Sequence, residues 1–171
     1  PESDETPETV TGEEQKNQIR FSKVAQPEAV PPSFYISAPN DKLLRLIGTK
    51  DSLFALTTEA IYRINGLGES WSVAPFDLNE KLLAPELVTS AEGLIYAQTQ
   101  NGLVAFDEGG LNNISRPYIG NTLQAAFDAV WDSEPDNWFA KMAADTTNKE
   151  IWLHYMDGSA LSSAYMWNYE T

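Results

Sequence analysis

The sequence has no cysteine and a single histidine, and these two features exclude several kinds of chemistry. Without cysteine there is no disulfide, no thiolate metal site and no cysteine nucleophile. One imidazole cannot form a metal site that needs several. His154 could still serve a Ser-His-Asp triad, but the sequence has no Gly-x-Ser-x-Gly motif to carry the serine. We therefore predict a protein that is not an enzyme, with no catalytic residue, no metal site and no cofactor.

Basic residues are scarce as well. The chain has 11 Lys and Arg against 25 Asp and Glu, which gives a formal net charge of -14. Affinity for nucleic-acid phosphates needs clustered Lys and Arg, so this balance argues against nucleic-acid binding. No apolar run approaches the roughly 20 residues that span a bilayer, and we expect no membrane segment.

The first residues differ from the rest of the chain. They lack the basic and apolar regions of a signal peptide and an initiator Met, so we expect an excised or processed part of something longer. Residues 1–18 carry six acids and only one lysine. This composition predicts a solvated, flexible arm over residues 1–18. The alternative is that the acidic arm docks on a basic partner.

Beyond the arm, short alternating segments predict strands. Residues 19–24 alternate apolar and polar side chains, as a half-buried strand does. Three prolines between residues 26 and 32 then interrupt regular structure, because proline removes a ladder donor and fixes φ. Further strands are predicted at residues 34–36, 42–49, 52–56, 60–65, 70–76, 137–145, 150–155 and 164–169.

A repeat is the most informative feature of the sequence. Residues 53–64 align with residues 95–106 without a gap, at an offset of 95 − 53 = 42 residues, and an alanine and a threonine match in place. A third, looser copy begins at Ile151, which is 151 − 95 = 56 residues further on. The extra length lies in a polar and acidic insertion at residues 120–136. We predict that the first two copies are superposable antiparallel hairpins.

A period of roughly 40 to 45 residues with four short strands is typical of β-propeller blades. We therefore predict an all-β, propeller-like fold, with about three four-stranded antiparallel blades at approximately residues 42–78, 82–119 and 137–171. A β-sandwich also has short strands at this spacing, but it would not explain a gapless self-match.

Three blades cannot close a ring, because propellers have about four to eight. One resolution is that residues 19–24 supply the fourth strand of the last blade. The other, which we favour, is that the remaining blades come from a second polypeptide or from another part of the same gene product. The fold is then part of a larger or incomplete propeller.

Two acidic groups could be taken for functional sites. The segment Asp132–Asp136 resembles the start of a calcium loop, but Asn137 stands where the loop needs glycine and Ala143 where it needs glutamate. We interpret it as a solvated acidic loop. Carboxylates that meet at a blade rim could cleave glycosides, but many acids of this chain satisfy that description equally well. Asp77, Asp107 and Asp128 are three of the acids that could meet at a blade rim in this way.

Aromatic residues crowd the last third of the chain, where they could pack between blades or bind sugars. We favour packing. In the strand at residues 151–155, His154 shares a face with Trp152, and we expect it to be half exposed. The aromatic residues concerned are Trp131, Trp138, Trp152, Trp167, Tyr155, Tyr165 and Tyr169.

Several segments together resemble a family of virion proteins. Phe21, Ser22, Val24, Pro27 and Glu28 follow an aromatic-Ser-x-Val-x-x-Pro-Glu pattern. Further matching segments lie at residues 47–64, 84–86, 93–106, 114–117, 152–153 and 166–169. In their order and spacing, over residues 19–169, they are similar to the tail-tube and tail-stabilisation proteins of short-tailed bacteriophages, known as tail tubular protein B or the nozzle.

The resemblance implies a structural protein of the virion tail, assembled in the host cytoplasm. Six copies would form a ring around the DNA exit channel, next to portal, adaptor and tail-fibre proteins, with DNA only as passing cargo. Family members run to several hundred residues with further blades, so contacts to these partners cannot be assigned to residues here. The competing hypotheses are a carbohydrate- or protein-binding propeller fragment used in receptor recognition and, least favoured, a glycosidase built on propeller blades.

Overall fold

The computed structural model describes residues 16–39, 41–67, 70–115, 122, 123, 125, 138–157 and 160–170. Thr122, Leu123 and Ala125 are helical, and every element whose bounds the structure gives is a strand, which confirms the all-β prediction. The strands belong to four separate antiparallel sheets of two to four strands each. No described helix is long and apolar enough to cross a membrane.

The first four-stranded sheet is a simple meander. It consists of β3 (Leu43–Gly48), β4 (Leu53–Thr57), β5 (Ile61–Leu67) and β6 (Ser70–Asp77), in that order. The four strands predicted between residues 42 and 78 are therefore confirmed. Alternate side chains of β4 point to opposite faces, and both faces are buried: Phe54 and Leu56 belong to one hydrophobic cluster and Ala55 to another.

The second four-stranded sheet repeats the first. It consists of β7 (Val88–Ala91), β8 (Leu94–Thr99), β9 (Gly102–Asp107) and β10 (Gly110–Asn113), again as a meander. Leu53 pairs with Ile64 in the first sheet, and Ile95 pairs with Phe106 in the second. The second pair lies 42 residues after the first, and each pair joins the second and third strands of its sheet. The predicted equivalence of the two hairpins is confirmed.

The third sheet has three strands in the described residues: β11 (Trp138–Asp145), β12 (Glu150–Asp157) and β13 (Ala160–Asn168). The strands predicted at residues 137–145, 150–155 and 164–169 are confirmed. The description of this blade as four-stranded is not, because β13 has β12 as its only strand neighbour in the described part of the chain. Most of the predicted acidic insertion at residues 120–136 lies outside the described residues.

The N-terminal strands form a sheet of their own. β1 (Gln18–Arg20) pairs with β2 (Tyr35–Ser37), and the proline-containing segment connects them. Residues 19–24 therefore do not supply the fourth strand of the last blade, which corrects the first of the two resolutions. Pairing across a short connection is favoured because closing a short loop costs less chain entropy than closing a long one.

The folded part of the chain begins before residue 19. The backbone N–H of Leu43 donates to the carbonyl oxygen of Lys16 at 2.8 Å, and that of Ala38 donates to the carbonyl oxygen of Asn17 at 3.0 Å. These bonds attach residues 16–18, which we had assigned to the arm, to the neighbouring strands. Residues 1–15, the remainder of the predicted arm, lie outside the described residues.

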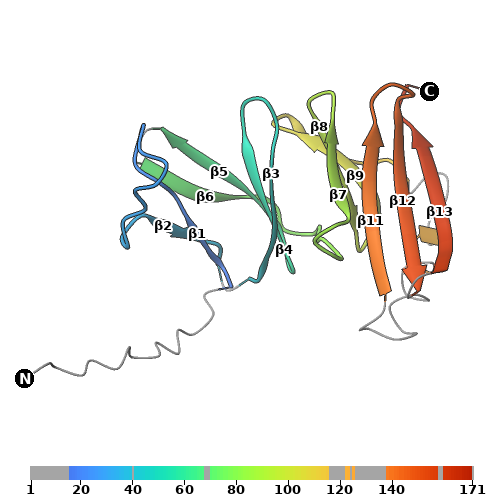
Figure 1. Ribbon diagram of the computed structural model, residues 1–171, viewed down its shortest axis with the longest axis horizontal. Helices are drawn as coiled ribbons and strands as arrows, with labels where there is room; N and C mark the ends of the chain where they lie inside the picture. Colours follow the sequence, from blue (N-terminus) through green and yellow to red (C-terminus); the bar gives the residue numbers. More distant parts are fainter. Residues whose placement is uncertain are drawn as a thin grey trace, which may run out of the picture.

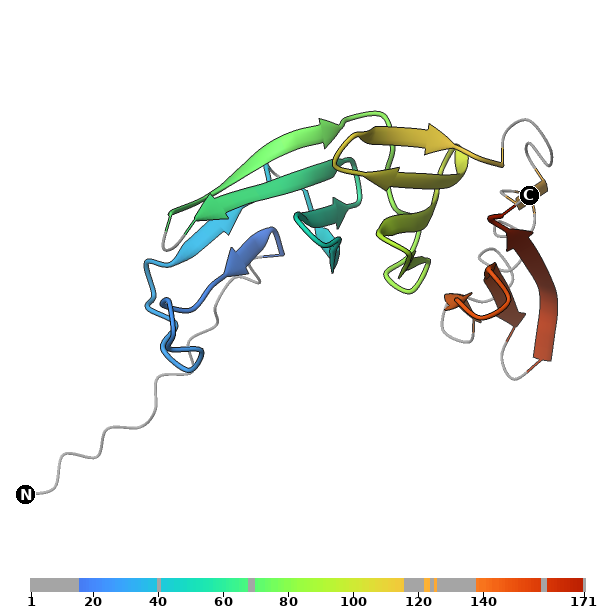
Figure 2. The same cartoon turned by 90° about the horizontal axis from the view of Figure 1, so that it is seen from above.

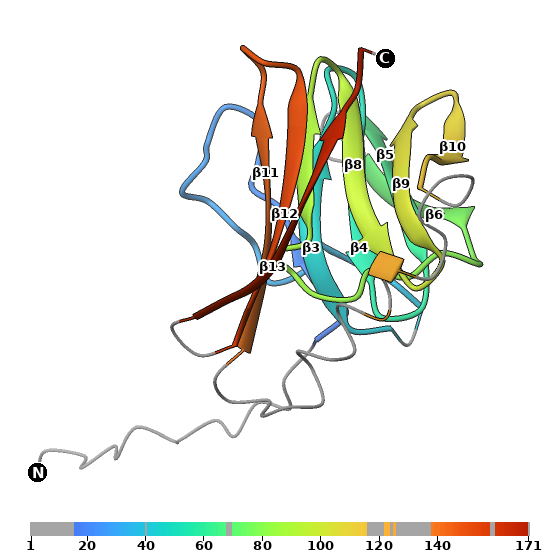
Figure 3. The same cartoon turned by 90° about the vertical axis from the view of Figure 1, so that its right-hand side faces the viewer.

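The sheets follow one another along an arc in chain order (Figure 2). Their first strands lie side by side, with β7 in contact with both β3 and β11 (Figure 1). Within each meander sheet, the strands that follow the first lie progressively further from this row of first strands. The described strands close no ring. In Figure 3 the third sheet lies in front of the others, and its face turned away from the second sheet is covered by no other described strand.

The core has two parts. The larger cluster fills the spaces between the three meander sheets, and the smaller one lies between the first sheet and the β1–β2 pair. In β12 the predicted alternation is confirmed: Ile151, Leu153 and Tyr155 are fully buried, whereas Trp152 and His154 are half-buried on the other face. The third sheet therefore contributes only one of its two faces to the core.

Candidate functional site

His154 lies on the open face of the third sheet. Its ring stacks on that of Trp152, with the centroids 5.9 Å apart and the planes 20° from parallel. Its partners across the two neighbouring strands are Lys141 and Ala164. This half-exposed position agrees with the sequence analysis, and neither cross-strand partner is a group that a catalytic triad requires.

The acids considered for catalysis shape turns. Asp77 accepts the backbone N–H groups of Asn79 at 2.7 Å and Glu80 at 3.1 Å. Asp107 accepts the backbone N–H of Gly109 at 2.7 Å. Such local bonds are the ordinary role of aspartate at a strand end. Asp128 lies outside the described residues.

No described residues form a metal-binding cluster: groups of three or more His, Asp or Glu side chains suited to a cation do not occur among them. The segment Asp132–Asp136 lies outside the described residues, as does Trp131. The side chain of Trp138 is also undescribed. Nothing in the described part of the chain can therefore be assigned to the calcium-like pattern.

The other aromatic residues of the last third pack between sheets, as predicted. Tyr155 is fully buried and donates a hydrogen bond from its hydroxyl to the side-chain oxygen of Gln98 in the second sheet. The rings of Tyr169 and Tyr96 lie 5.7 Å apart, and Tyr165 and Trp167 also pack on the larger cluster. Trp152 is the exception, because it lies on the open face of the third sheet.

A threonine at the end of β4 organises the first hairpin turn. The Thr57 hydroxyl donates to the carbonyl oxygen of Ala60 at 2.8 Å and accepts the N–H of the same residue at 3.0 Å. It also lies 3.3 Å from Asp41, whose carboxylate accepts a 2.7 Å hydrogen bond from the hydroxyl of Tyr62. A buried turn is thereby tied to a carboxylate from the segment that precedes the sheet.

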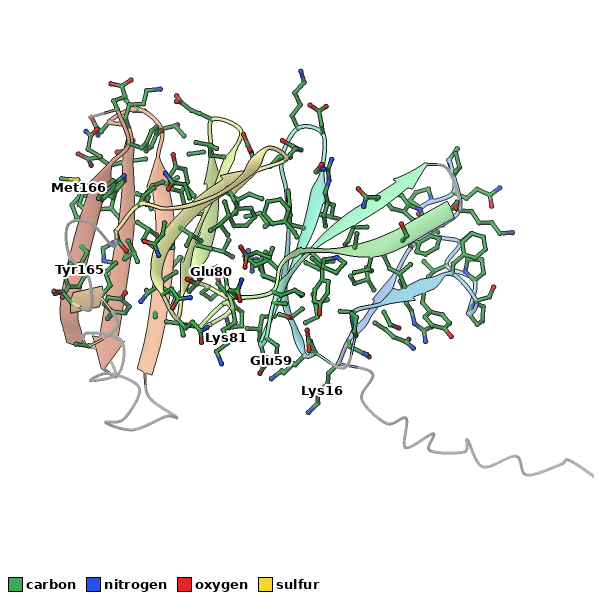
Figure 4. The ribbon with its side chains drawn as sticks, turned by 180° about the vertical axis from the view of Figure 1, so that it is seen from behind. Lys16, Glu59, Glu80, Lys81, Tyr165 and Met166 are labelled. Carbon is green, nitrogen blue, oxygen red and sulfur yellow. The ribbon has the colours of Figure 1, made fainter. Side chains whose placement is uncertain are left out.

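Thr99 has the same role 42 residues later. Its hydroxyl bonds to the carboxylate of Glu80, which is 92% buried, and lies 3.1 Å from the carbonyl oxygen of Gly102. Asn101 donates a further bond to Glu80 at 3.2 Å. Both turns lie at the same end of the molecule, where Glu59, Glu80 and Lys81 are labelled in Figure 4. The matched threonines are visible in the sequence, but their acidic partners are not, because Asp41 and Glu80 do not occupy matched positions in the repeat.

The bond between Tyr62 and Asp41 predicts a loss of stability at high pH. Burial raises the pKa of Tyr62 to about 12, and the carboxylate of Asp41 adds to the increase. Because the folded state holds this proton more tightly than the unfolded chain, the stabilisation is complete below about pH 10 and is lost between about pH 10 and 12. In urea titrations over this interval, Tyr62→Phe should lose less stability than the wild type. An equal loss in both proteins would contradict the assignment.

A cavity of about 350 Å³ lies between the second and third sheets. The described residues of its wall are mostly apolar and aromatic, with one amide side chain and two tyrosines. It is lined by Leu94, Tyr96, Ala105, Phe106, Gly110, Asn112, Ile114, Trp167 and Tyr169. The Tyr169 hydroxyl oxygen is buried and has no hydrogen-bond partner among the described residues.

A second, more polar hollow of about 560 Å³ lies around the turn between β3 and β4. Lys50, Asp51, Arg63 and Trp71 contribute to its wall. Cations and an anion therefore share one open depression, and its chemistry does not select a particular ligand.

Comparison of the sequence with models of known protein families gave no match, and comparison with curated proteins gave none either.

Proposed function

We propose that this chain is a non-catalytic structural module of the tail of a short-tailed bacteriophage. Each of its three meander sheets is one blade of a β-propeller, and the β1–β2 pair belongs to a further blade. The propeller is part of the nozzle, a ring of six copies that surrounds the DNA exit channel and contacts adaptor, portal and tail-fibre proteins.

The blade arrangement is supported by three features. The sheets share the same up-and-down order, their first strands lie side by side, and the first two have their central hairpins in identical register. Radially packed four-stranded meanders are the unit of propellers. Each blade buries both faces only when it has a neighbour on each side.

The observation that carries the structural role is that the arc is open at both ends. At one end Met166 is 50% exposed beside the half-buried Trp152 and His154, and at the other Tyr35 is 47% exposed. Large side chains on an exposed sheet face indicate a contact with another protein surface. Neighbouring blades, from the same gene product or from another copy, would cover these faces.

The charge of the chain suits a conduit for DNA. With a net charge of -14, the module repels phosphates and would not hold DNA that has to pass quickly. The half-exposed His154 and the turn-forming aspartates need no catalytic role in this account. The resemblance of residues 19–169 to tail-tube proteins supports the same conclusion.

Immunogold electron microscopy tests the proposal. Antibodies raised against the chain should label intact phage particles of the source at the tail, and mass spectrometry of purified virions should find six copies for each particle. Absence of the protein from purified virions would overturn the proposal. A second candidate function, carbohydrate binding in receptor recognition, is favoured by the aromatic cavity between the second and third sheets.

A further inference from the structure

Three aromatic rings fill the space between the first and second sheets. Phe54 on β4 and Phe76 on β6 come from the first sheet, and Phe106 on β9 comes from the second. Their ring centroids lie 5.0 to 5.8 Å apart, and the two rings of Phe54 and Phe106 meet edge to face. These are favourable distances for aromatic pairs.

The repeat identifies the equivalent positions one sheet further on. Tyr96 is the equivalent of Phe54 at the 42-residue offset. In the first sheet, Tyr62 pairs with Pro75, and Phe76 is the next residue. In the second sheet, Val104 pairs with Asn113, and Ile114 is the next residue. Since Tyr62 and Val104 are themselves 42 residues apart, Ile114 takes the place of Phe76.

The third ring also has an equivalent. Phe106 pairs with Ile95 in the second sheet, and Trp167 pairs with Ile151, the residue that matches Ile95 in the third copy. The second space between sheets is thus bordered by Tyr96, Ile114 and Trp167, all of which line the 350 Å³ cavity. An isoleucine replaces one of the three phenylalanines in this set, so one ring fewer fills the space beside the cavity.

The chemistry of the wall defines what this cavity can hold. None of the described residues that line it is charged, so the bound part of a ligand is expected to be uncharged. The aromatic residues Tyr96, Trp167 and Tyr169 in the wall offer apolar ring surface on which a partly apolar ring can stack. The Asn112 side chain lines the cavity and is exposed, so its amide can donate and accept hydrogen bonds with a neutral ligand that carries several hydroxyls.

We propose that this cavity binds one pyranose ring of a neutral sugar. The C–H face of the sugar would stack on an aromatic ring, and its hydroxyls would bond to the amide of Asn112. A volume of about 350 Å³ lies at the lower end of the roughly 300 to 1,000 Å³ of ligand pockets. The inference needs only the contact between the second and third sheets, so it does not depend on the tail-tube role.

Nitrogen-labelled indole resonances give a direct test, because each tryptophan side chain has its own N–H signal. The full chain is titrated with the methyl glycosides of glucose, galactose and mannose and with N-acetylglucosamine. At least one of these sugars should shift the Trp167 indole resonance in a saturable way and leave the Trp152 resonance unchanged. Trp167→Ala should weaken binding more than tenfold. The matched control, Trp152→Ala on the opposite face of the same sheet, should bind as the wild type does.

Two further variants separate loss of the site from loss of folding. Asn112→Ala removes an exposed amide from the cavity wall and should weaken binding about fivefold, as the loss of one hydrogen bond does, while Tm stays the same. Ile114→Phe places a ring where Phe76 lies in the first space, and it should abolish binding while Tm stays the same or rises. No saturable shift with any sugar would overturn the proposal. So would binding that persists in Ile114→Phe, or binding of indole in the cavity without binding of any sugar.

Discussion

Replacing Phe106 by alanine should lower the free energy of unfolding by about 3–5 kcal/mol, the usual cost of removing a buried phenylalanine ring. The side chain is 1% exposed and contacts the rings of Phe54 and Phe76 from the neighbouring sheet. Its loss removes apolar contacts and leaves a cavity that two sheets joined by a short connection cannot easily close. Because Phe106 links two sheets, the loss should affect their packing together rather than one hairpin alone.

Urea titration followed by tryptophan fluorescence measures this effect, at the lowest protein concentration that gives a reliable signal. Leu78→Ala is the control, because Leu78 is 63% exposed and its loss should change stability by no more than about 0.5 kcal/mol. If Phe106→Ala cost no more than this control, the described packing between the first and second sheets would be wrong.

Replacing Gly66 by alanine should destabilise the fold by about 1–3 kcal/mol, the usual cost of overpacking. Gly66 pairs with Trp71 across β5 and β6, and a Cβ at this position would lie 2.4 Å from the indole ring. The ring would have to move. It also lies 5.9 Å from the ring of Phe21, so the displacement would disturb the contact between the N-terminal segment and the first sheet.

Gly48 is a matched control on the same sheet. A Cβ there would have its nearest neighbour, a backbone oxygen, at 3.6 Å, which is an ordinary contact. Gly48→Ala should therefore be neutral, or slightly stabilising because alanine loses less backbone entropy than glycine on folding. Thermal unfolding of both variants decides the matter, and equal Tm values would show that Trp71 does not pack over Gly66.

The strands and their pairing within each sheet could be predicted because they depend on local information. Alternation of apolar residues defines a strand, and a short turn forces the next strand to pair with it. The matched alanine and threonine at the 42-residue offset further predicted that Leu53–Ile64 and Ile95–Phe106 are equivalent pairs. Both pairs are present in the structure.

Contacts between sheets could not be predicted in the same way. Whether Asp41 or Glu80 reaches a turn threonine depends on the path of a connecting segment, and these acids do not occupy matched positions in the repeat. Pairing of β1 with β2 was not predicted, because residues 19–24 were expected to pair with the last blade or with strands outside the chain. The cavity could not be predicted either. The equivalence of Ile114 with Phe76 follows only from the strand register, and the sequence alone does not distinguish Ile114 from other apolar residues.

Self-association of the isolated chain tests most directly whether both ends of the arc are open to further strands. Unpaired edges and uncovered apolar faces invite contact with other chains. Size-exclusion chromatography with light scattering, over a range of concentrations, should show a mass that rises above that of the monomer. Met166→Lys places a charge on the open face of the third sheet, where Met166 lies opposite Trp152, and should reduce the association; Leu78→Lys should not. A monomer that melts cooperatively at every concentration, with or without the Met166 change, would show that no outside strands are required.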